Sequence, residues 1–132
     1  MPSLNNKRVL LVDDEESVRL VIAMLLHGLG VTVFTAANGT EALNLYRSES
    51  FDLVLTDYGM PQMRGDELAR SIKTINPAQR VIVITGSVET VCEHGLPPCF
   101  DGIIPKPCSL NQLIDALNGK TASVASLRRL AA

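Results

Sequence analysis

Five polar residues stand at or just beyond the ends of short apolar runs and carry side chains that could do chemistry together: Asp13, Asp14, Asp57, Thr85 and Lys106. Three carboxylates gathered in one place would repel one another and raise each other's pKa unless a cation intervened, and hard oxygen ligands suit Mg²⁺. Mg²⁺ binds through one or two carboxylates plus phosphate oxygen, which leaves one carboxylate, here Asp57, free to act as a nucleophile. Phosphoryl transfer needs in-line placement and neutralised oxygen charge, which Mg²⁺, Lys106 and the Thr85 hydroxyl could supply.

The apolar runs predict strands that alternate with helices. Rich in β-branched residues, the runs expected to form strands are 9–12, 31–35, 53–56, 80–85 and 102–104. Helical spacing of apolar residues predicts helices over 17–29, 41–48, 66–75 and 110–117, the last with Ser109 as N-cap. The alternation implies a doubly wound α/β fold, with a mostly parallel sheet and helices on both of its faces. Ligands bind beyond the carboxyl ends of such strands, where the five polar residues fall.

Composition favours one globular domain of 132 residues with an aliphatic core, because 46% of the residues are hydrophobic and only 4% are aromatic. The net charge of −2 gives no broad basic surface, so direct contact with nucleic acid is not expected. The apolar run after the polar first residues is far too short for a signal peptide or a membrane span, which favours a cytoplasmic protein without membrane contact. The odd number and the spacing of Cys92, Cys99 and Cys108 indicate reduced thiols rather than disulfides or a zinc site.

Four motifs resemble, in this order, those of response regulator receiver domains, the switch modules of two-component signal transduction: V-L-L-V-D-D-E, D-L-V-L-T-D-Y-G-M-P, V-I-V-I-T-G and the K-P of I-I-P-K-P. The resemblance extends from Lys7 to about Asn118. It implies an N-terminal tail over 1–6, a receiver domain over 7–118 and a C-terminal tail or linker over 119–132. It also implies five parallel strands in the flavodoxin-like order 2-1-3-4-5.

The same resemblance implies a metal site. In receiver domains the acidic pair that matches Asp13 and Asp14 binds Mg²⁺ directly or through water. The aspartate that matches Asp57 accepts the phosphoryl group and belongs to the same site, which the backbone carbonyl of Gly59 should complete.

Two further residues are implied to act on the phosphoryl group. Thr85 and Lys106 match the family residues that contact it and couple it to a conformational change. By the same resemblance, the Lys106–Pro107 peptide bond should be cis, a form that is admissible before proline.

The sequence departs from the family at two places. Ile103 stands where receivers commonly have a switching Tyr or Phe, so the usual coupling through an aromatic rotamer lacks its ring. The segment 87–100 contains Gly95 and Pro97-Pro98 where the family has a regular fourth helix, and these residues break helices. We therefore expect a short or distorted fourth helix and an atypical output surface.

The expected function is a phosphorylation-controlled switch that receives its phosphoryl group from a sensor histidine kinase or a phosphotransfer protein. Its output is expected to be contact with a protein target that the sequence does not identify. The protein is expected to be a monomer or a weak dimer, and to catalyse no reaction beyond its own aspartyl phosphorylation and dephosphorylation. The segment 121–132 is interpreted as a docking helix or the start of a linker, with the linker favoured.

Other interpretations remain. One is a receiver-shaped binding module that recognises a partner through 87–100 without phosphorylation. A phosphatase of the haloacid dehalogenase type would need D-x-D after the first strand, which Asp13-Asp14-Glu15 does not provide. An FMN-binding flavodoxin-like protein would need a phosphate-binding loop, and acidic strand ends would repel the phosphate. Taken alone, Asp13 and Asp14 would be interpreted as helix caps.

Overall fold

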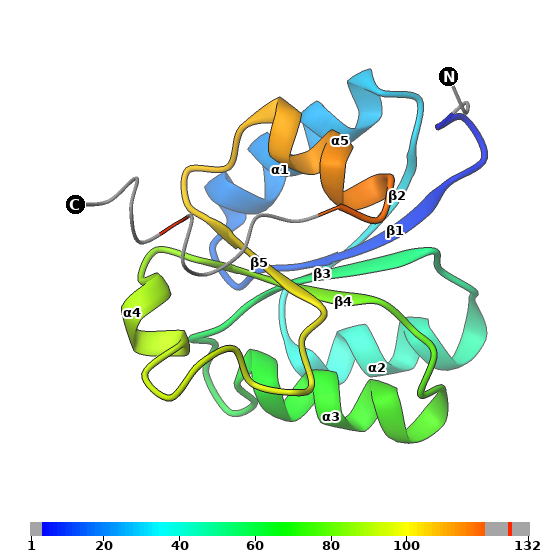
Figure 1. Ribbon diagram of the computed structural model, residues 1–132. Helices are drawn as coiled ribbons and strands as arrows, with labels where there is room; N and C mark the ends of the chain where they lie inside the picture. Colours follow the sequence, from blue (N-terminus) through cyan, green and yellow to red (C-terminus); the bar gives the residue numbers. More distant parts are fainter. Residues whose placement is uncertain (1–3, 121–126, 128–132) are drawn as a thin grey trace.

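Five parallel strands form one sheet in the order β2-β1-β3-β4-β5 (Figure 1). The computed structural model describes residues 4–120 and Leu127. The strands are β1 (Arg8–Val12), β2 (Thr32–Ala36), β3 (Leu53–Asp57), β4 (Val81–Thr85) and β5 (Gly102–Pro105). Each lies within one residue of its predicted bounds, so the expected doubly wound sheet and its flavodoxin-like order are confirmed.

Helices connect the strands: α1 (Glu16–Gly28), α2 (Gly39–Ser48), α3 (Gly65–Ile75), α4 (Val88–Val91) and α5 (Leu110–Leu117). Ser109 is the N-cap of α5 as predicted. Its hydroxyl accepts from the Gln112 backbone N–H, while the Gln112 side chain accepts from the Ser109 N–H, which together form a capping box. The prediction of a short fourth helix is also confirmed, because α4 has only four residues.

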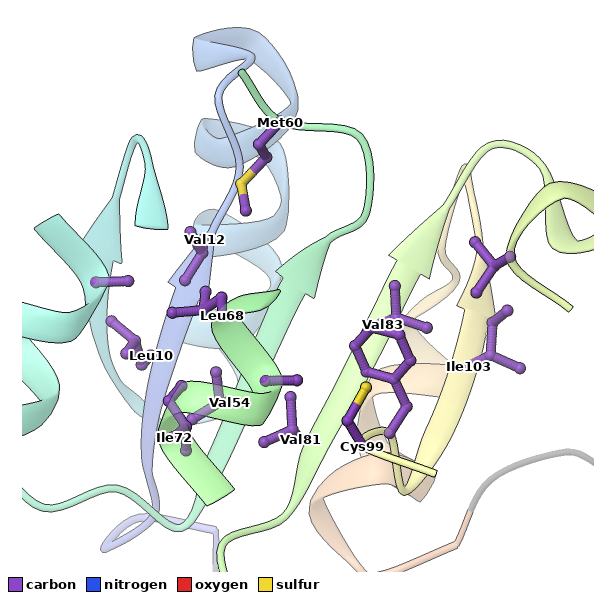
Figure 2. Packing of buried hydrophobic residues seen from close by; sticks show 14 of the residues in the cluster. Leu10, Val12, Val54, Met60, Leu68, Ile72, Val81, Val83, Cys99 and Ile103 are labelled. Carbon is purple, nitrogen blue, oxygen red and sulfur yellow. The ribbon is translucent and has the colours of Figure 1, made fainter. Parts of the chain in front are cut away.

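Two hydrophobic clusters lie on the two faces of the sheet. Side chains alternate along β1, so that Leu10 and Val12 join one cluster while Val9 and Leu11 join the other. The helices α2, α3 and α4 cover the first face, and α1 and α5 cover the second (Figure 1). Figure 2 shows part of the first cluster, with Leu10 and Val54 near Leu68 and Ile72 of α3, and with Ile103 on the far side of Val83. Strands buried on both faces hold the carboxyl edge of the sheet firmly in place.

The helix α1 differs from its expected pattern on one side. Ile22 and Leu26 are buried, as the helical spacing of the apolar residues in 17–29 predicts, but Val21, another of these apolar residues, is 57% exposed. Met24 is 72% exposed. The sequence therefore supplies α1 with more apolar residues than the face toward the sheet can bury.

Most of the two predicted tails, 1–6 and 119–132, lies outside the described residues. The parts that are not described are 1–3, 121–126 and 128–132. Leu127 is described and is buried with the first cluster. The three cysteines are free, with Cys92 and Cys99 buried and Cys108 half-buried, which agrees with the prediction of reduced thiols. Within the described part of the chain, every helix is too short or too polar to cross a membrane.

Candidate functional site

The carboxyl ends of two neighbouring strands, β1 and β3, bring the predicted acidic residues together. Asp13 and Asp14 follow β1 directly, and Asp57 is the last residue of β3. One carboxylate oxygen from each of the three side chains lies within 4.8 Å of the others. Asp13 is buried, Asp57 is half-buried and Asp14 is exposed. The predicted acidic cluster is therefore present, and it is open to solvent on the side of Asp14.

Asp13 is held by both its main chain and its side chain. Its backbone N–H donates to the Ala36 carbonyl oxygen at 3.1 Å, and its own carbonyl oxygen accepts from the Arg19 guanidinium at 2.7 Å. Its Oδ1 accepts from the Glu15 N–H at 2.9 Å, at the turn that leads into α1. The capping interpretation is wrong for Asp13, because the N-cap of α1 is Glu15 and no side chain caps this helix. Asp13 Oδ1 bonds the turn before the helix, while Oδ2 pairs with Lys106.

Lys106 binds two of the three acids at once. Its Nζ lies 3.0 Å from Asp13 Oδ2 and 3.2 Å from Asp57 Oδ1. The backbone N–H of Lys106 donates to the Thr85 carbonyl oxygen at 2.7 Å, which extends the contact between β4 and β5 by one residue. The peptide bond to Pro107 is cis, as the resemblance implied.

The electrostatics of the site follow from this sharing of one cation. Burial, together with the negative charge of Asp13, raises the pKa of Asp57, and Lys106 offsets this increase only in part. Burial alone would lower the pKa of Lys106, but its hydrogen bond to Asp13 and the charge of Asp57 outweigh burial and raise it. Lys106 therefore stays charged, and its single positive charge does not balance the negative charge of the three carboxylates.

Thr85 lies at the same edge but is bonded away from the acids. It is buried at the end of β4, immediately after Ile84, which is the register partner of Asp57. The Thr85 hydroxyl accepts from the Ser87 N–H at 3.0 Å and lies 3.3 Å from the Ser87 carbonyl oxygen. Ser87 is the N-cap of α4 and accepts from the Thr90 N–H. The hydroxyl thus joins the site to the first turn of α4.

The loop after β3 is packed closely against Asp57. The Tyr58 N–H donates to Asp57 Oδ1 at 2.9 Å, and the Gly65 N–H donates to the Tyr58 carbonyl oxygen at 2.7 Å. A Cβ at Gly65 would collide with the Asp57 carbonyl oxygen, so only glycine lets α3 start this close to β3. Gly59 is exposed in this loop, and its carbonyl remains a predicted metal ligand.

Sequence reasoning missed an aromatic contact beside the site. The Tyr58 ring packs edge-on against Phe100, with 6.5 Å between the ring centroids. The Arg64 guanidinium lies over the Tyr58 ring, 5.6 Å from its centroid, and also pairs with Asp66 at the start of α3. The sequence did contain a signal for this contact. The chain has only two Tyr and three Phe, and one of these aromatic residues directly follows Asp57 while another lies just before β5.

A groove of about 400 Å³ adjoins Lys106, and sequence reasoning missed it as well. Val18, Val21 and Ile22 of α1 form one wall, and Lys106 with the two residues that follow it forms the other. The excess of apolar residues in α1 was a signal for this second surface. The groove places an apolar surface next to the charged site.

Comparisons with known proteins agree with the site. The sequence pattern of the family "Response regulator receiver domain" matches residues 9–118. The chain is 34% identical over 128 residues to the autoinducer 1 sensor kinase/phosphatase LuxN of Vibrio campbellii, and the match covers 92% of this chain and 15% of LuxN. For the sensor kinase CckA of Brucella abortus the identity is 38% over 108 residues, covering 80% of this chain and 11% of CckA. The chain thus spans only a small part of these relatives.

One similar solved structure contains Mg²⁺-BeF. The response regulator TrrA of Thermotoga maritima, in complex with Mg²⁺-BeF, matches with a TM-score of 0.79 and 29% identity. The match covers 86% of this chain and 97% of TrrA.

The pKa of Asp57 tests the electrostatics of the site in metal-free protein. Asp13→Asn should lower this pKa, because it removes a negative neighbour, and Lys106→Met should raise it, because it removes the neighbouring cation. The measurement is a pH titration of the Asp57 carboxyl ¹³C signal. Asp115→Asn, on the exposed side of α5, is the control and should leave the titration unchanged. A Lys106→Met titration equal to wild type would contradict the ion pair.

Proposed function

Because the chain belongs to the response regulator receiver family, we propose that it is a phosphorylation-controlled switch that accepts a phosphoryl group on Asp57 from a histidine kinase or a phosphotransfer protein. One observation carries the proposal. Asp57 lies half-buried between two further carboxylates and a lysine that already contacts it. A nucleophile, an acidic metal-binding cluster and a fixed cation thus occur within one edge of the sheet.

The geometry favours Asp57 Oδ2 as the nucleophile. Within residues 4–120 and Leu127, the hydrogen bond from Tyr58 and the ion pair with Lys106 both fall on Oδ1. These contacts fix the carboxylate and leave Oδ2 for attack on phosphorus. The new bond joins Oδ2 to phosphorus, and the bond from phosphorus to the donor's leaving group breaks as the leaving group takes the electron pair.

Lys106 and Thr85 act on the phosphoryl oxygens in this proposal. The Lys106 ammonium is already 3.2 Å from Asp57 and needs only a small movement to neutralise a phosphoryl oxygen. The 3.3 Å hydrogen bond from the Thr85 hydroxyl to the Ser87 carbonyl oxygen is weak. The hydroxyl can therefore donate to a phosphoryl oxygen instead. The first residue stabilises charge, and the second transmits the change to α4.

The acidic cluster fits Mg²⁺. Asp13, Asp14 and Asp57 present hard oxygen ligands within 4.8 Å of one another, and the carbonyl of Gly59 is proposed as a fourth protein ligand. When bound, Mg²⁺ would supply the positive charge that neutralises both the crowded carboxylates and the transferred phosphoryl group. The pKa of Asp57, raised by burial and by Asp13, agrees with a site that is short of positive charge.

The groove beside Lys106 is the surface we propose for the phosphodonor. Its wall on α1 continues into side chains that are unusually exposed for their type, namely Leu20, Val21 and Met24. An exposed apolar patch next to a reactive site favours contact with a protein rather than with a small molecule. Because kinases draw on ATP, we place this exchange in the cytoplasm. The output is proposed to be contact with a protein, and no enzymatic reaction beyond turnover of the aspartyl phosphate is proposed.

Intact-mass analysis tests the phosphorylation directly. After incubation with Mg²⁺ and acetyl phosphate, the wild-type chain should gain one phosphoryl group that is stable in acid and labile in base. The adduct should disappear without Mg²⁺ and in Asp57→Asn, because the nucleophile is lost. Asp52 directly precedes β3, at the opposite end of this strand from Asp57. Asp52→Asn is therefore the matched control and should keep the adduct.

A folded wild-type chain that gains no adduct from acetyl phosphate or from histidine kinases would contradict the proposal. That outcome would favour the module that binds its partner through 87–100 without phosphorylation.

Mg²⁺ should stabilise the fold by binding the acidic cluster. At a concentration one hundred times its dissociation constant, a ligand specific for the folded state adds about 2.7 kcal/mol to the free energy of unfolding. Thermal unfolding with and without Mg²⁺ measures this gain. Asp14→Asn should reduce it to less than half, whereas Glu16→Gln, an exposed acid two residues away and outside the cluster, should retain it. Equal gains in wild type and Asp14→Asn would place the metal elsewhere.

The groove is tested by comparing two kinds of donor. Met24→Ser should slow phosphoryl transfer from any histidine kinase or phosphotransfer protein that uses this chain, by about tenfold in kcat/KM, since truncation of an interface anchor costs more than 1 kcal/mol. Its rate with acetyl phosphate should stay unchanged. Ile75→Ser, which changes an equally apolar and 49% exposed residue at the end of α3, should affect neither rate. A normal transfer rate in Met24→Ser would exclude this face of α1.

A further inference from the structure

A second groove, of about 590 Å³, adjoins α3, which covers the opposite face of the sheet from α1 (Figure 1). Its lining includes Arg70 and Lys73 from α3, and Pro97, Pro98 and Cys99 from the segment between α4 and β5. None of its described lining residues is acidic. The volume falls within the range of ligand-binding pockets. The groove thus combines an apolar lining with two cations on the side of α3.

Arg70 has a positive charge that its neighbours balance only in part. Asp66 already accepts from Arg64 with both carboxylate oxygens, at 3.1 Å and 2.9 Å. Arg70 reaches the same carboxylate through Nη1, at 3.2 Å, and its side chain is 58% exposed. Two arginines therefore share one acid. Because a guanidinium has five N–H donors in a fixed fork, Arg70 can still bind an incoming carboxylate through two of them.

Lys73 is held in place beside Arg70. Its Nζ lies 2.7 Å from Asp101 Oδ2, and this oxygen also accepts from the backbone N–H of Val81, the first residue of β4, at 2.8 Å. The spacing of three residues puts Arg70 and Lys73 on one side of α3. In the ion pairs around the groove, the cations Arg64, Arg70 and Lys73 face only the two acids Asp66 and Asp101. One positive charge is therefore in excess in this group.

We propose that this groove binds an acidic segment of the protein that the switch controls, and this assignment rests on the proposed function. A carboxylate of the segment pairs with Arg70, where the excess of positive charge is complementary to it. An apolar side chain of the segment packs against Pro97 and Pro98, whose rings offer no N–H to a polar ligand. This pairing of one charged and one apolar contact favours a peptide over a small free anion.

Tyr58 connects the phosphorylation site to both sides of this groove. Its N–H donates to Asp57 Oδ1. Its ring packs against Phe100, which directly follows the cysteine of the groove. The Arg64 guanidinium lies over the same ring and shares its carboxylate partner with Arg70. A phosphoryl group on Asp57 that shifts Tyr58 therefore changes the groove and its affinity for the acidic segment.

Peptide arrays test the chemistry of the partner. The probes are hexapeptides in which Asp or Glu alternates with Leu, Val or Pro, together with a matched set that has Asn or Gln in place of each acid. Acidic members should bind the full chain, and their amide counterparts should bind about tenfold more weakly, because only a carboxylate forms the charged pair with Arg70. No binding to any acidic member would overturn the proposal, as would equal binding of the amide set.

Two arginine variants test the place of binding. Arg70→Gln should weaken the binding of the tightest acidic peptide by about tenfold, because it removes the charged partner. The matched control is Arg47→Gln, which makes the same change of charge at an exposed residue of α2 outside the groove and should leave the affinity unchanged. Equal weakening in both variants would indicate unspecific attraction and would overturn the groove as the site.

NMR spectroscopy and a competitor complete the test. In ¹H–¹⁵N spectra, the peptide should shift the amide signals of Thr74 and Cys99, which line the groove. Unchanged signals at both residues would overturn the assignment. Succinate, a free dicarboxylate, should not displace the peptide at the same concentration, because it makes no contact with the prolines. Displacement by succinate would assign the groove to a small anion instead of a protein.

These comparisons need no phosphoryl group, so their failure is distinct from failure of the proposed function. In chains whose adduct is verified by mass, the affinity for the same peptide should change by about fivefold or more, the usual size of coupling between two sites. An unchanged affinity would overturn the link through Tyr58. A chain that binds the acidic peptides but gains no adduct would support the groove and contradict the switch alone.

Discussion

The structure depends on holding three carboxylates within 4.8 Å of one another at one edge of a sheet. Two like charges about 4 Å apart repel by about 4 kcal/mol at the effective dielectric constant of a protein surface. The repulsion is tolerated because the strands that carry the acids are buried on both faces and cannot separate. Lys106 offsets part of it through its contacts with Asp13 and Asp57. The remaining repulsion is not balanced by any other cation that contacts the cluster within the described residues, and under our proposed function a divalent cation binds there.

The same crowding makes the site sensitive to any new charge. Lys106 cannot move toward a phosphoryl group without loosening its contact with Asp13, and Thr85 cannot turn toward one without loosening its contact with α4. Short helices such as α4 have few internal hydrogen bonds, so they rearrange at low cost. Tyr58 reaches the same region from the other side through Phe100. Under our proposed function, the region from α4 to β5 is therefore the first to respond to a phosphoryl group on Asp57, although Ile103 provides no aromatic ring for this response.

The sequence was sufficient for the sheet and for the acids, for physical reasons. Buried parallel strands are continuous runs of Val, Ile and Leu, so their ends are sharp in the sequence, and parallel order puts all those ends at one edge. The contacts of Lys106 and Thr85 were beyond sequence reasoning. Spacing places both residues at the edge, but the sharing of Lys106 between two acids and the bond from Thr85 to Ser87 depend on side-chain positions that only packing decides.

The burial of individual apolar residues is likewise not decided by the sequence pattern. Val21 and Leu127 are similar in hydrophobicity, yet Val21 is 57% exposed in α1 and Leu127, which follows α5 in the chain, is 6% exposed. What decides their burial is the structure opposite them. α1 faces solvent on its outer side, whereas the face beside β5 lacks a full helix. Under our proposed function the exposed apolar side of α1 has a use, because side chains such as Val21 and Met24 remain available for contact with a protein phosphodonor beside Lys106.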